Sequence, residues 1–282
     1  MRVRLWGTRG SLASASPDTV RYGGNTACVE VVGEDGTRLV LDAGTGIRNL
    51  GATFNGTAGR VDLLLTHLHM DHIQGLGFFK PLQDPDMDVH IWGPSSTTLD
   101  LRARLARYLS PPLFPVRLRE LPCRLTLHDV PAHRVRIGEF VVTAALVCHP
   151  GPTVGYRISE GRKTLVYLPD HEPALASDPF PGDPAWTSGF DLARGADLLI
   201  HDAQYLDHEY PEHLGWGHSS TSQVVAFARL AGVRRLVPFH HDPNHDDDAL
   251  DAMVAEARRL AGDAFEVLPG TEGLQLRILP AL

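Results

Sequence analysis

The stretch LLLTHLHMDHIQGL at residues 63–76 places three histidines and one aspartate within six positions, directly after a run of leucines. The apolar run is typical of a buried β-strand. Because residues i and i+2 of a strand share a face, His67 and His69 are expected to point to one place where the strand ends. Asp71 and His72 follow, and an aspartate suits the first turn of a helix. This pattern favours a metal pair over a single ion; the alternative is a polar loop with scattered histidines.

The composition indicates to which broad class of protein the chain belongs. The 282 residues are 43% hydrophobic and 21% charged, as is ordinary for a soluble globular protein with a sizeable core. No apolar run approaches the about 20 residues of a membrane span, and the N-terminus MRVRLWGTRG lacks the apolar core of a signal peptide. We therefore expect a cytoplasmic protein with no membrane segment.

Net charge and cysteine content limit the substrates and metal sites that we expect. The net charge of −8 disfavours a large nucleic acid as the main substrate, because phosphate neutralisation needs a basic surface, although a local basic patch is compatible with it. The three cysteines, Cys28, Cys123 and Cys148, are too few and too scattered for a disulfide framework or a cysteine-rich zinc site. We expect them to be reduced and buried.

Short β-rich runs recur along the chain, and helical patterns lie between some of them. The expected strands are Val3–Trp6, Ala27–Val32, Arg38–Leu41, Asp62–Leu65, Val89–Trp92, Phe140–Val147, Val154–Ile158, Thr164–Leu168, Asp197–Ile200, Arg235–Phe239 and Leu274–Leu279. The expected helices are Ser96–Leu109, Ser219–Leu230 and Asp247–Ala261. Since strands come in blocks as well as in alternation with helices, the pattern predicts two mixed β-sheets packed face to face with helices on both outer faces, a four-layer αββα sandwich. No repeat or linker divides the chain, so we expect a single domain over residues 1–282.

Two long segments, residues 173–189 and 204–217, have the composition of loops. Long loops in a compact domain are often lids or substrate walls, and the alternative is an ordinary surface connection. Scattered aromatic residues could form a wall for a nucleobase, or else belong to the core. These are Phe78, Phe79, Pro81, Tyr108, Phe114, Tyr205, Tyr210 and Trp216.

Further metal ligands are expected at other strand ends. His149 follows FVVTAALVC, Asp170 follows TLVYLP and His240 follows RLVPF. Two zinc ions about 3.5–4 Å apart, held by histidine nitrogens and a shared carboxylate, fit such a set. Cys148 is a competing ligand but is expected in the core, because adjacent strand residues point to opposite faces. For the same reason His240 and His241 are alternatives for the last ligand.

These motifs resemble the metallo-β-lactamase fold superfamily. The resemblance rests on HLHMDH at 67–72, LVLDAGTG at 39–46 and the isolated His, Asp and His downstream. It implies that His67, His69 and His149 bind one metal, that Asp71, His72 and His240 bind the other, and that Asp170 bridges them. It also implies that Asp42 braces the ligand loop.

Finer motifs look like the branch of ribonuclease Z and the class II cyclic-nucleotide phosphodiesterases. They are RYGGNTACVEV (21–31), CHPGPTVGYRI (148–158), LLIHDAQY (198–205) and GHSSTSQ (217–223). The resemblance implies that His218 assists phosphodiester cleavage, with hydrogen-bonding support of His218 or the metal loop from His201 and Asp202; the alternative is that His218 only caps a helix. The long Gly/Pro-rich arm with which ribonuclease Z grips tRNA is missing between His149 and Asp170.

The sequence therefore predicts a dinuclear metal-dependent hydrolase with Asp71 and His218 as catalytic residues. We expect a phosphodiesterase that cleaves a small phosphodiester, such as a cyclic nucleotide or nucleotide derivative, through a metal-bridging hydroxide. Hydrolysis of a carboxylic ester, lactone or thioester is the second hypothesis, and a non-catalytic metal-binding protein is the third. Zinc is the expected metal, with manganese or iron also compatible. Related proteins are often dimers, so a homodimer is compatible with the resemblance.

Overall fold

The computed structural model describes residues 1–54, 59–130, 134–177 and 179–279. Its first sheet contains β1 (Arg2–Gly7), β2 (Cys28–Val32), β3 (Arg38–Leu41), β4 (Gly59–Leu64), β5 (Met87–Pro94), β6 (Arg124–Val130) and β14 (Gln275–Arg277). Its second sheet contains β7 (Val135–Ile137), β8 (Phe140–Leu146), β9 (Val154–Glu160), β10 (Lys163–Leu168), β11 (Leu198–Asp202), β12 (Arg235–Phe239) and β13 (Glu266–Val267). The helices are α1 (Ile47–Gly51), α2 (Met70–Ile73), α3 (Leu101–Tyr108), α4 (Phe190–Ala193), α5 (Thr221–Ala231) and α6 (Asp247–Ala261).

Both sheets are mixed and have seven strands each, in the orders β14-β1-β2-β3-β4-β5-β6 and β13-β12-β11-β10-β9-β8-β7. In the first sheet, β3 to β6 are parallel neighbours, whereas β14, β1, β2 and β3 pair antiparallel. In the second sheet, β10 to β13 are parallel, and β7 to β10 are antiparallel. The parallel strands of each sheet end at a common edge, where their carboxyl-terminal loops can meet.

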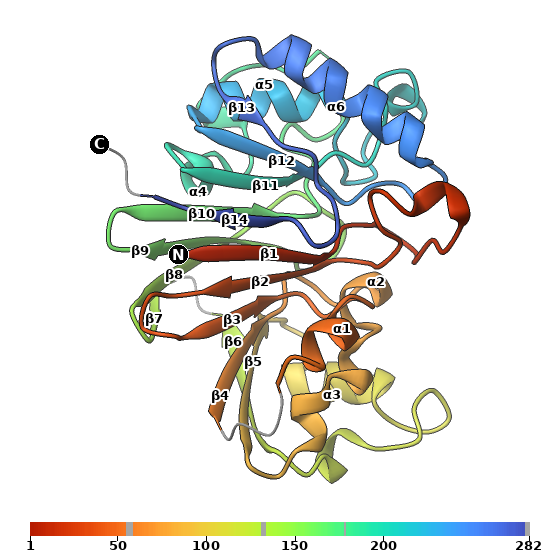
Figure 1. Cartoon of the computed structure of the whole chain (residues 1–282), viewed down its shortest axis with the longest axis vertical. Helices are drawn as coiled ribbons and strands as arrows, with labels where there is room; N and C mark the ends of the chain where they lie inside the picture. Colours follow the sequence, from red (N-terminus) through yellow and green to blue (C-terminus); the bar gives the residue numbers. More distant parts are fainter. Residues whose placement is uncertain (55–58, 131–133, 178, 280–282) are drawn as a thin grey trace.

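Three apolar cores hold the layers together. The first lies between the sheets and includes Leu5 and Leu41 of one sheet and Tyr156 and Phe239 of the other. The second packs the outer face of the second sheet under α5 and α6, and the third packs the first sheet under α1 and α3. Figure 1 shows these helices on opposite sides of the paired sheets. The predicted four-layer αββα sandwich is confirmed.

Every expected strand overlaps an observed one, and α6 has the predicted bounds. The helix expected from residue 96 begins only at Leu101, where the Asp100 side chain accepts a hydrogen bond from the backbone N–H of Ala103. Three strands were missed, namely β6, β7 and β13. All three are edge strands, whose open side carries polar residues and weakens the apolar signal.

Within the described residues, no helix has the length and apolar character needed to cross a membrane. The extension of a single domain over residues 1–282 stays a prediction.

Candidate metal centre

The functional side chains gather at the edge where the parallel strands of both sheets end. His67 and His69 follow β4, Asp170 follows β10, and His240 follows β12. His149 follows β8, which runs parallel to β10 because each pairs antiparallel with β9. The sheets are rigid, so residues placed directly after their strands are held at fixed positions.

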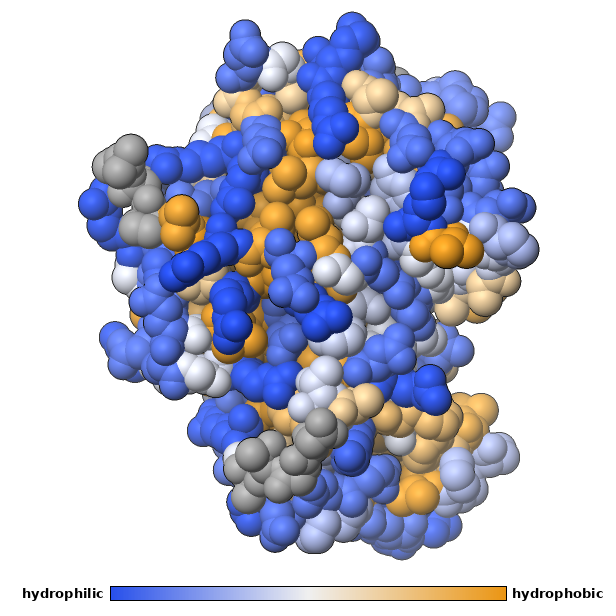
Figure 2. All heavy atoms as spheres, viewed as in Figure 1, coloured by the Kyte–Doolittle hydropathy of each residue, from blue (hydrophilic) through white to orange (hydrophobic). Residues whose placement is uncertain are grey.

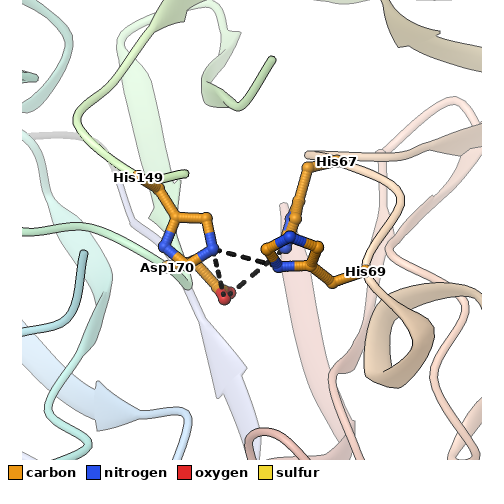
Figure 3. A group of neighbouring side chains, drawn as sticks. All are labelled: His67, His69, His149 and Asp170. Atoms are coloured by element: carbon orange, nitrogen blue, oxygen red, sulfur yellow. Dashed lines mark hydrogen bonds and ion pairs between the residues drawn. The ribbon is translucent and has the colours of Figure 1, made fainter. Parts of the chain in front are cut away.

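The first ligand group consists of His67, His69, His149 and Asp170, and one ligating atom from each lies within 4.8 Å of all the others. Nε2 of His149 is 3.1 Å from Nδ1 of His69 and 3.6 Å from Oδ2 of Asp170. Nε2 of His67 is also 3.6 Å from that carboxylate oxygen. Figure 3 shows the three rings and the carboxylate pointing at one another from separate segments of the chain.

The second ligand group consists of Asp71, His72, Asp170 and His240, all of them buried. Nε2 of His72 lies 2.9 Å from Oδ1 of Asp170, 3.2 Å from Oδ2 of Asp71 and 3.2 Å from Nε2 of His240. Asp170 therefore belongs to both groups. The structure thus brings together all seven residues that the sequence singled out as metal ligands.

Outside contacts fix which nitrogen of each histidine faces the centre. Nδ1 of His72 donates to Asp42 at 2.8 Å, Nδ1 of His149 to the carbonyl of Gly217 at 2.9 Å, and Nδ1 of His240 to Oε1 of Gln204 at 3.0 Å. Because these acceptors require an N–H at Nδ1, each neutral ring presents the lone pair of Nε2 to the interior. Such second contacts are usual for histidines that bind metals.

The donor set fits divalent cations. The inward-facing imidazole nitrogens and carboxylate oxygens are all hydrogen-bond acceptors, and too few donors lie between them. Nε2 of His67 is buried with no hydrogen-bond partner. Burial disfavours a charge on His72, yet the carboxylates of Asp170, Asp71 and Asp42 raise its pKa above the ordinary value. The site therefore demands positive charge, which divalent ions would supply.

Asp42 braces the ligand loop. Its Oδ1 accepts the backbone N–H of Thr66 at 2.7 Å, and its Oδ2 accepts the hydroxyl of Tyr167 at 3.0 Å as well as His72. The aspartate is completely buried and has a left-handed backbone, with φ of 58°. These contacts fit the supporting role that the sequence resemblance implied for Asp42.

His218 lies beside the two ligand groups and pairs with Asp202. Its Nδ1 is 2.6 Å from Oδ2 of Asp202, and its ring stacks on that of His240 with centroids 5.0 Å apart. Burial disfavours the charged imidazolium, but the Asp202 carboxylate outweighs this and raises the pKa of His218 to about 9. The carboxylate also accepts backbone N–H groups from His171 and Ser219, which holds it in place.

His201 is oriented differently from the prediction. Its ring turns toward Phe227, and its Nε2 lies 2.9 Å from Nδ1 of His171. The side chains of His201 and Asp202 point to opposite faces of β11, so the side chain of His201 does not contact His218. Any hydrogen-bonding support from His201 therefore passes through His171.

The other open alternatives are decided by side-chain direction. His240 enters the second ligand group, whereas Nε2 of His241 lies 2.9 Å from the carbonyl of Gly270. Cys148 is only partly buried, unlike Cys28 and Cys123, which are buried as expected. Among the aromatic residues that could form a wall or belong to the core, Phe79, Tyr205 and Tyr210 are core residues, while Phe78 and Trp216 are exposed.

Sequence reasoning missed several supporting residues. Glu172 is completely buried, and its carboxylate accepts the backbone N–H groups of Ala176, Gly215 and Gly217 and the hydroxyl of Tyr210. It thereby ties segment 173–189 to segment 204–217. Its sequence signal, a lone Glu after Asp170 and His171, carried no information on these partners.

Two close approaches were also missed. The backbone N–H of Ser11 donates to Oδ2 of Asp71 at 2.8 Å. At Gly10, a Cβ would lie 2.2 Å from Nδ1 of His240, so only glycine leaves room for that ring.

This fold, with two His/Asp groups at the ends of its strands, defines a metallo-β-lactamase-fold hydrolase. The chain belongs to the family described as the Beta-lactamase superfamily domain, whose model matches residues 37–241. The family resemblance predicted from the sequence is confirmed.

The relatives of the chain agree with the predicted branch. It is 26% identical to a protein named Ribonuclease Z from Haloarcula marismortui, over 99% of this chain and 97% of that one. A Ribonuclease Z from Myxococcus xanthus is 29% identical over 78% of this chain and 82% of that one.

Solved structures share the fold. The metallo-beta-lactamase fold protein YhfI from Bacillus subtilis superposes with a TM-score of 0.71 at 20% identity, over 98% of this chain and 99% of that one. Human tRNase Z, short form, superposes with a TM-score of 0.68 at 24% identity, over 99% and 100% of the two chains.

Proposed function

We infer that the protein is a dinuclear metal-dependent phosphodiesterase that acts on a small phosphodiester. The observation that carries this inference is the position of Asp170 between the two ligand groups. Its Oδ1 lies 2.9 Å from Nε2 of His72 in one group, and its Oδ2 lies 3.6 Å from Nε2 of His67 in the other. One carboxylate can thus serve two ions.

The residues that would hold the ions are His67, His69 and His149 for one, Asp71, His72 and His240 for the other, and Asp170 for both. Imidazole nitrogens and carboxylate oxygens suit zinc first, and manganese or iron accept the same ligands. When bound, such ions would lower the pKa of a water molecule and neutralise charge on the phosphoryl oxygens.

Two residues of the chain would act in the reaction. The Asp71 carboxylate, held by the N–H of Ser11 at 2.8 Å, would orient the attacking water. His218 would donate a proton to the leaving oxygen, since Asp202 holds its Nδ1 at 2.6 Å and favours the protonated ring. A leaving alkoxide needs that proton, whereas a nitrophenolate does not.

The segment between His149 and Asp170 favours a small substrate. It is taken up by β9, β10 and their connecting turns, so it holds no long arm that could grip a folded RNA. The relatives named Ribonuclease Z and tRNase Z act by name on RNA, which is in tension with a small substrate. We propose a cyclic nucleotide or a nucleotide derivative on the ground of the missing arm.

The test is turnover of the metal-loaded protein on a bis-aryl phosphodiester and on a simple lactone, side by side. Cleavage of the diester alone supports the proposal and leads to a panel of cyclic nucleotides and RNA 3′ ends. Cleavage of the lactone alone would mean that the site hydrolyses carboxylic esters. Cleavage of neither substrate by a protein with full metal content would favour a non-catalytic binding protein. Turnover of RNA ends without turnover of cyclic nucleotides would refute the small substrate.

A further inference from the structure

The outer face of the first sheet carries an open groove of about 600 Å³, away from the metal centre. Among the residues that the structure describes, its lining comes from β14, β1, β2 and β3, from the turn between β2 and β3, and from Thr53 in the turn after α1. Figure 1 shows β1 and β14 on the viewer's side, and Figure 2 shows mainly hydrophilic surface over β1 and β2, with hydrophobic surface above them in the view. Its volume falls within the about 300–1,000 Å³ typical of small-molecule sites.

The strand register lines the groove with arginines. Arg2 of β1 lies directly opposite Arg277 of β14, and Arg4 follows two residues later on the same face. On the other side of β1, Arg2 pairs with Val32, and Val32 pairs with Arg38. Like charges directly opposite each other on neighbouring strands destabilise a sheet. A chain with a net charge of −8 nevertheless concentrates four arginines here.

Among the described residues, only one of these four arginines has an ion-pair partner. Arg38 forms an ion pair with Glu30, which is the carboxylate in the lining. In the described part of the chain, no ion pair involves Arg2, Arg4 or Arg277. The Nε of Arg4 is in addition buried without a hydrogen-bond partner. This nitrogen is not available to a ligand, so the charge that Arg4 offers to the groove is carried by the rest of its guanidinium group.

The groove also contains a flat stacking surface. The guanidinium carbon of Arg4 lies 3.9 Å from the ring centroid of Trp6. The indole N–H of Trp6 donates to Glu30 at 3.1 Å, and Glu30 is in turn held by Arg38. The stack is therefore fixed before any ligand arrives. Guanidinium planes and indole rings both stack on nucleobases.

A purely structural explanation is that arginine stems cover apolar strand residues where a helix is missing. That role would be served as well by residues of mixed charge, and it gives no reason for placing Arg2 opposite Arg277. We propose that the groove is a second ligand site that binds a small nucleotide. Its phosphates contact Arg2 and Arg277, and its base stacks on the guanidinium of Arg4, which itself lies on the ring of Trp6. The site does not depend on the reaction at the metal centre.

The experiment measures binding of the β,γ-imido analogue of ATP to the metal-loaded protein by equilibrium dialysis, at low and at high salt. In the double variant Arg2→Ser/Arg277→Ser the affinity is expected to fall at least about tenfold, because two charge-assisted contacts are lost. The control Arg107→Ser removes an exposed arginine on α3 and should leave the affinity unchanged. Turnover of the bis-aryl diester should be equal in all three proteins.

Binding at the metal centre is separated by a further variant. The analogue should still bind to Asp170→Ala, in which both ligand groups lose a carboxylate oxygen. It should also bind more tightly than inorganic tripolyphosphate if the base stacks on Arg4. Loss of binding in Asp170→Ala with retention in the arginine double variant would place the analogue at the metal centre and overturn the proposal. Equal affinities for the analogue and tripolyphosphate would overturn the stacking of the base on Arg4. No binding, or binding of only a single-stranded oligonucleotide, would overturn the nucleotide site. None of these outcomes depends on whether the metal centre cleaves a phosphodiester.

Discussion

His218 and Asp202 form a hydrogen bond of 2.6 Å between Nδ1 and Oδ2, and Asp202 is completely buried. The ring of His218 is stacked on His240 and lies edge-on to His149, with centroid distances of 5.0 and 4.9 Å. An imidazole paired with a buried carboxylate is thus held next to members of both ligand groups. This arrangement suits proton donation to a leaving group.

Replacing His218 with alanine should slow cleavage of a diester with an alkyl leaving group by about 10²–10⁴-fold. A diester with a nitrophenolate leaving group should be cleaved almost as fast as by the wild type, because its leaving oxygen needs no proton. Steady-state rates on the two substrates check this. An equal loss on both would assign His218 to binding or folding.

Replacing Asp170 with alanine should lower the bound metal from two ions per chain toward one and largely abolish turnover, because both ligand groups lose a carboxylate oxygen. Elemental analysis after dialysis measures the metal directly. Asp191→Ala is the matched control, since Asp191 is exposed on α4. Full metal content in Asp170→Ala would refute the bridging role.

Glu172→Gln should reduce turnover and lower the free energy of unfolding by about 1–3 kcal/mol. The carboxylate accepts N–H groups at 2.9 Å from Gly215 and 2.8 Å from Gly217, and an amide nitrogen facing either would leave a buried donor unpaired. The carbonyl of Gly217 accepts Nδ1 of His149, so the metal ligand should be displaced with the turn. Urea unfolding and turnover are compared with the exposed control Glu212→Gln. A stability loss with unchanged turnover would limit Glu172 to a structural role.

His201 should make the protein sensitive to acid. Burial lowers the pKa of His201 to about 4, whereas the ring takes up a proton near pH 6.5 once the chain unfolds. Its contribution to stability is therefore present above about pH 6.5 and is lost as the pH falls toward about 4, by up to about 3 kcal/mol. His201→Gln should weaken this dependence, and His208→Gln, at an exposed position, should not. Urea unfolding between pH 7.5 and 4.5 measures both; parallel curves for His201→Gln and the wild type would exclude the effect.

Much of the fold follows from local sequence pattern. The HLHMDH stretch ends a strand and opens a helix, so its four ligating residues are placed together by period-2 and first-turn geometry alone. The same reasoning placed His149, Asp170 and His240 at strand ends. Edge strands such as β7 and β13 escaped because two or three residues with one polar side give no periodic signal.

The sequence by itself determined which residue types stand at the strand ends, because apolar runs and their boundaries are local properties. Only the tertiary structure decided where those side chains point and what holds them. His240 lies beyond the end of β12 with a left-handed φ of 60°, a backbone conformation that the alternation of side chains along a strand does not predict. This conformation directs His240, and not His241, into the ligand group. Glu172 and the row of arginines on β1 and β14 likewise gain their meaning from partners that are distant along the chain. Burial of a charge requires its partners to be assembled around it, and that assembly is a property of the folded chain.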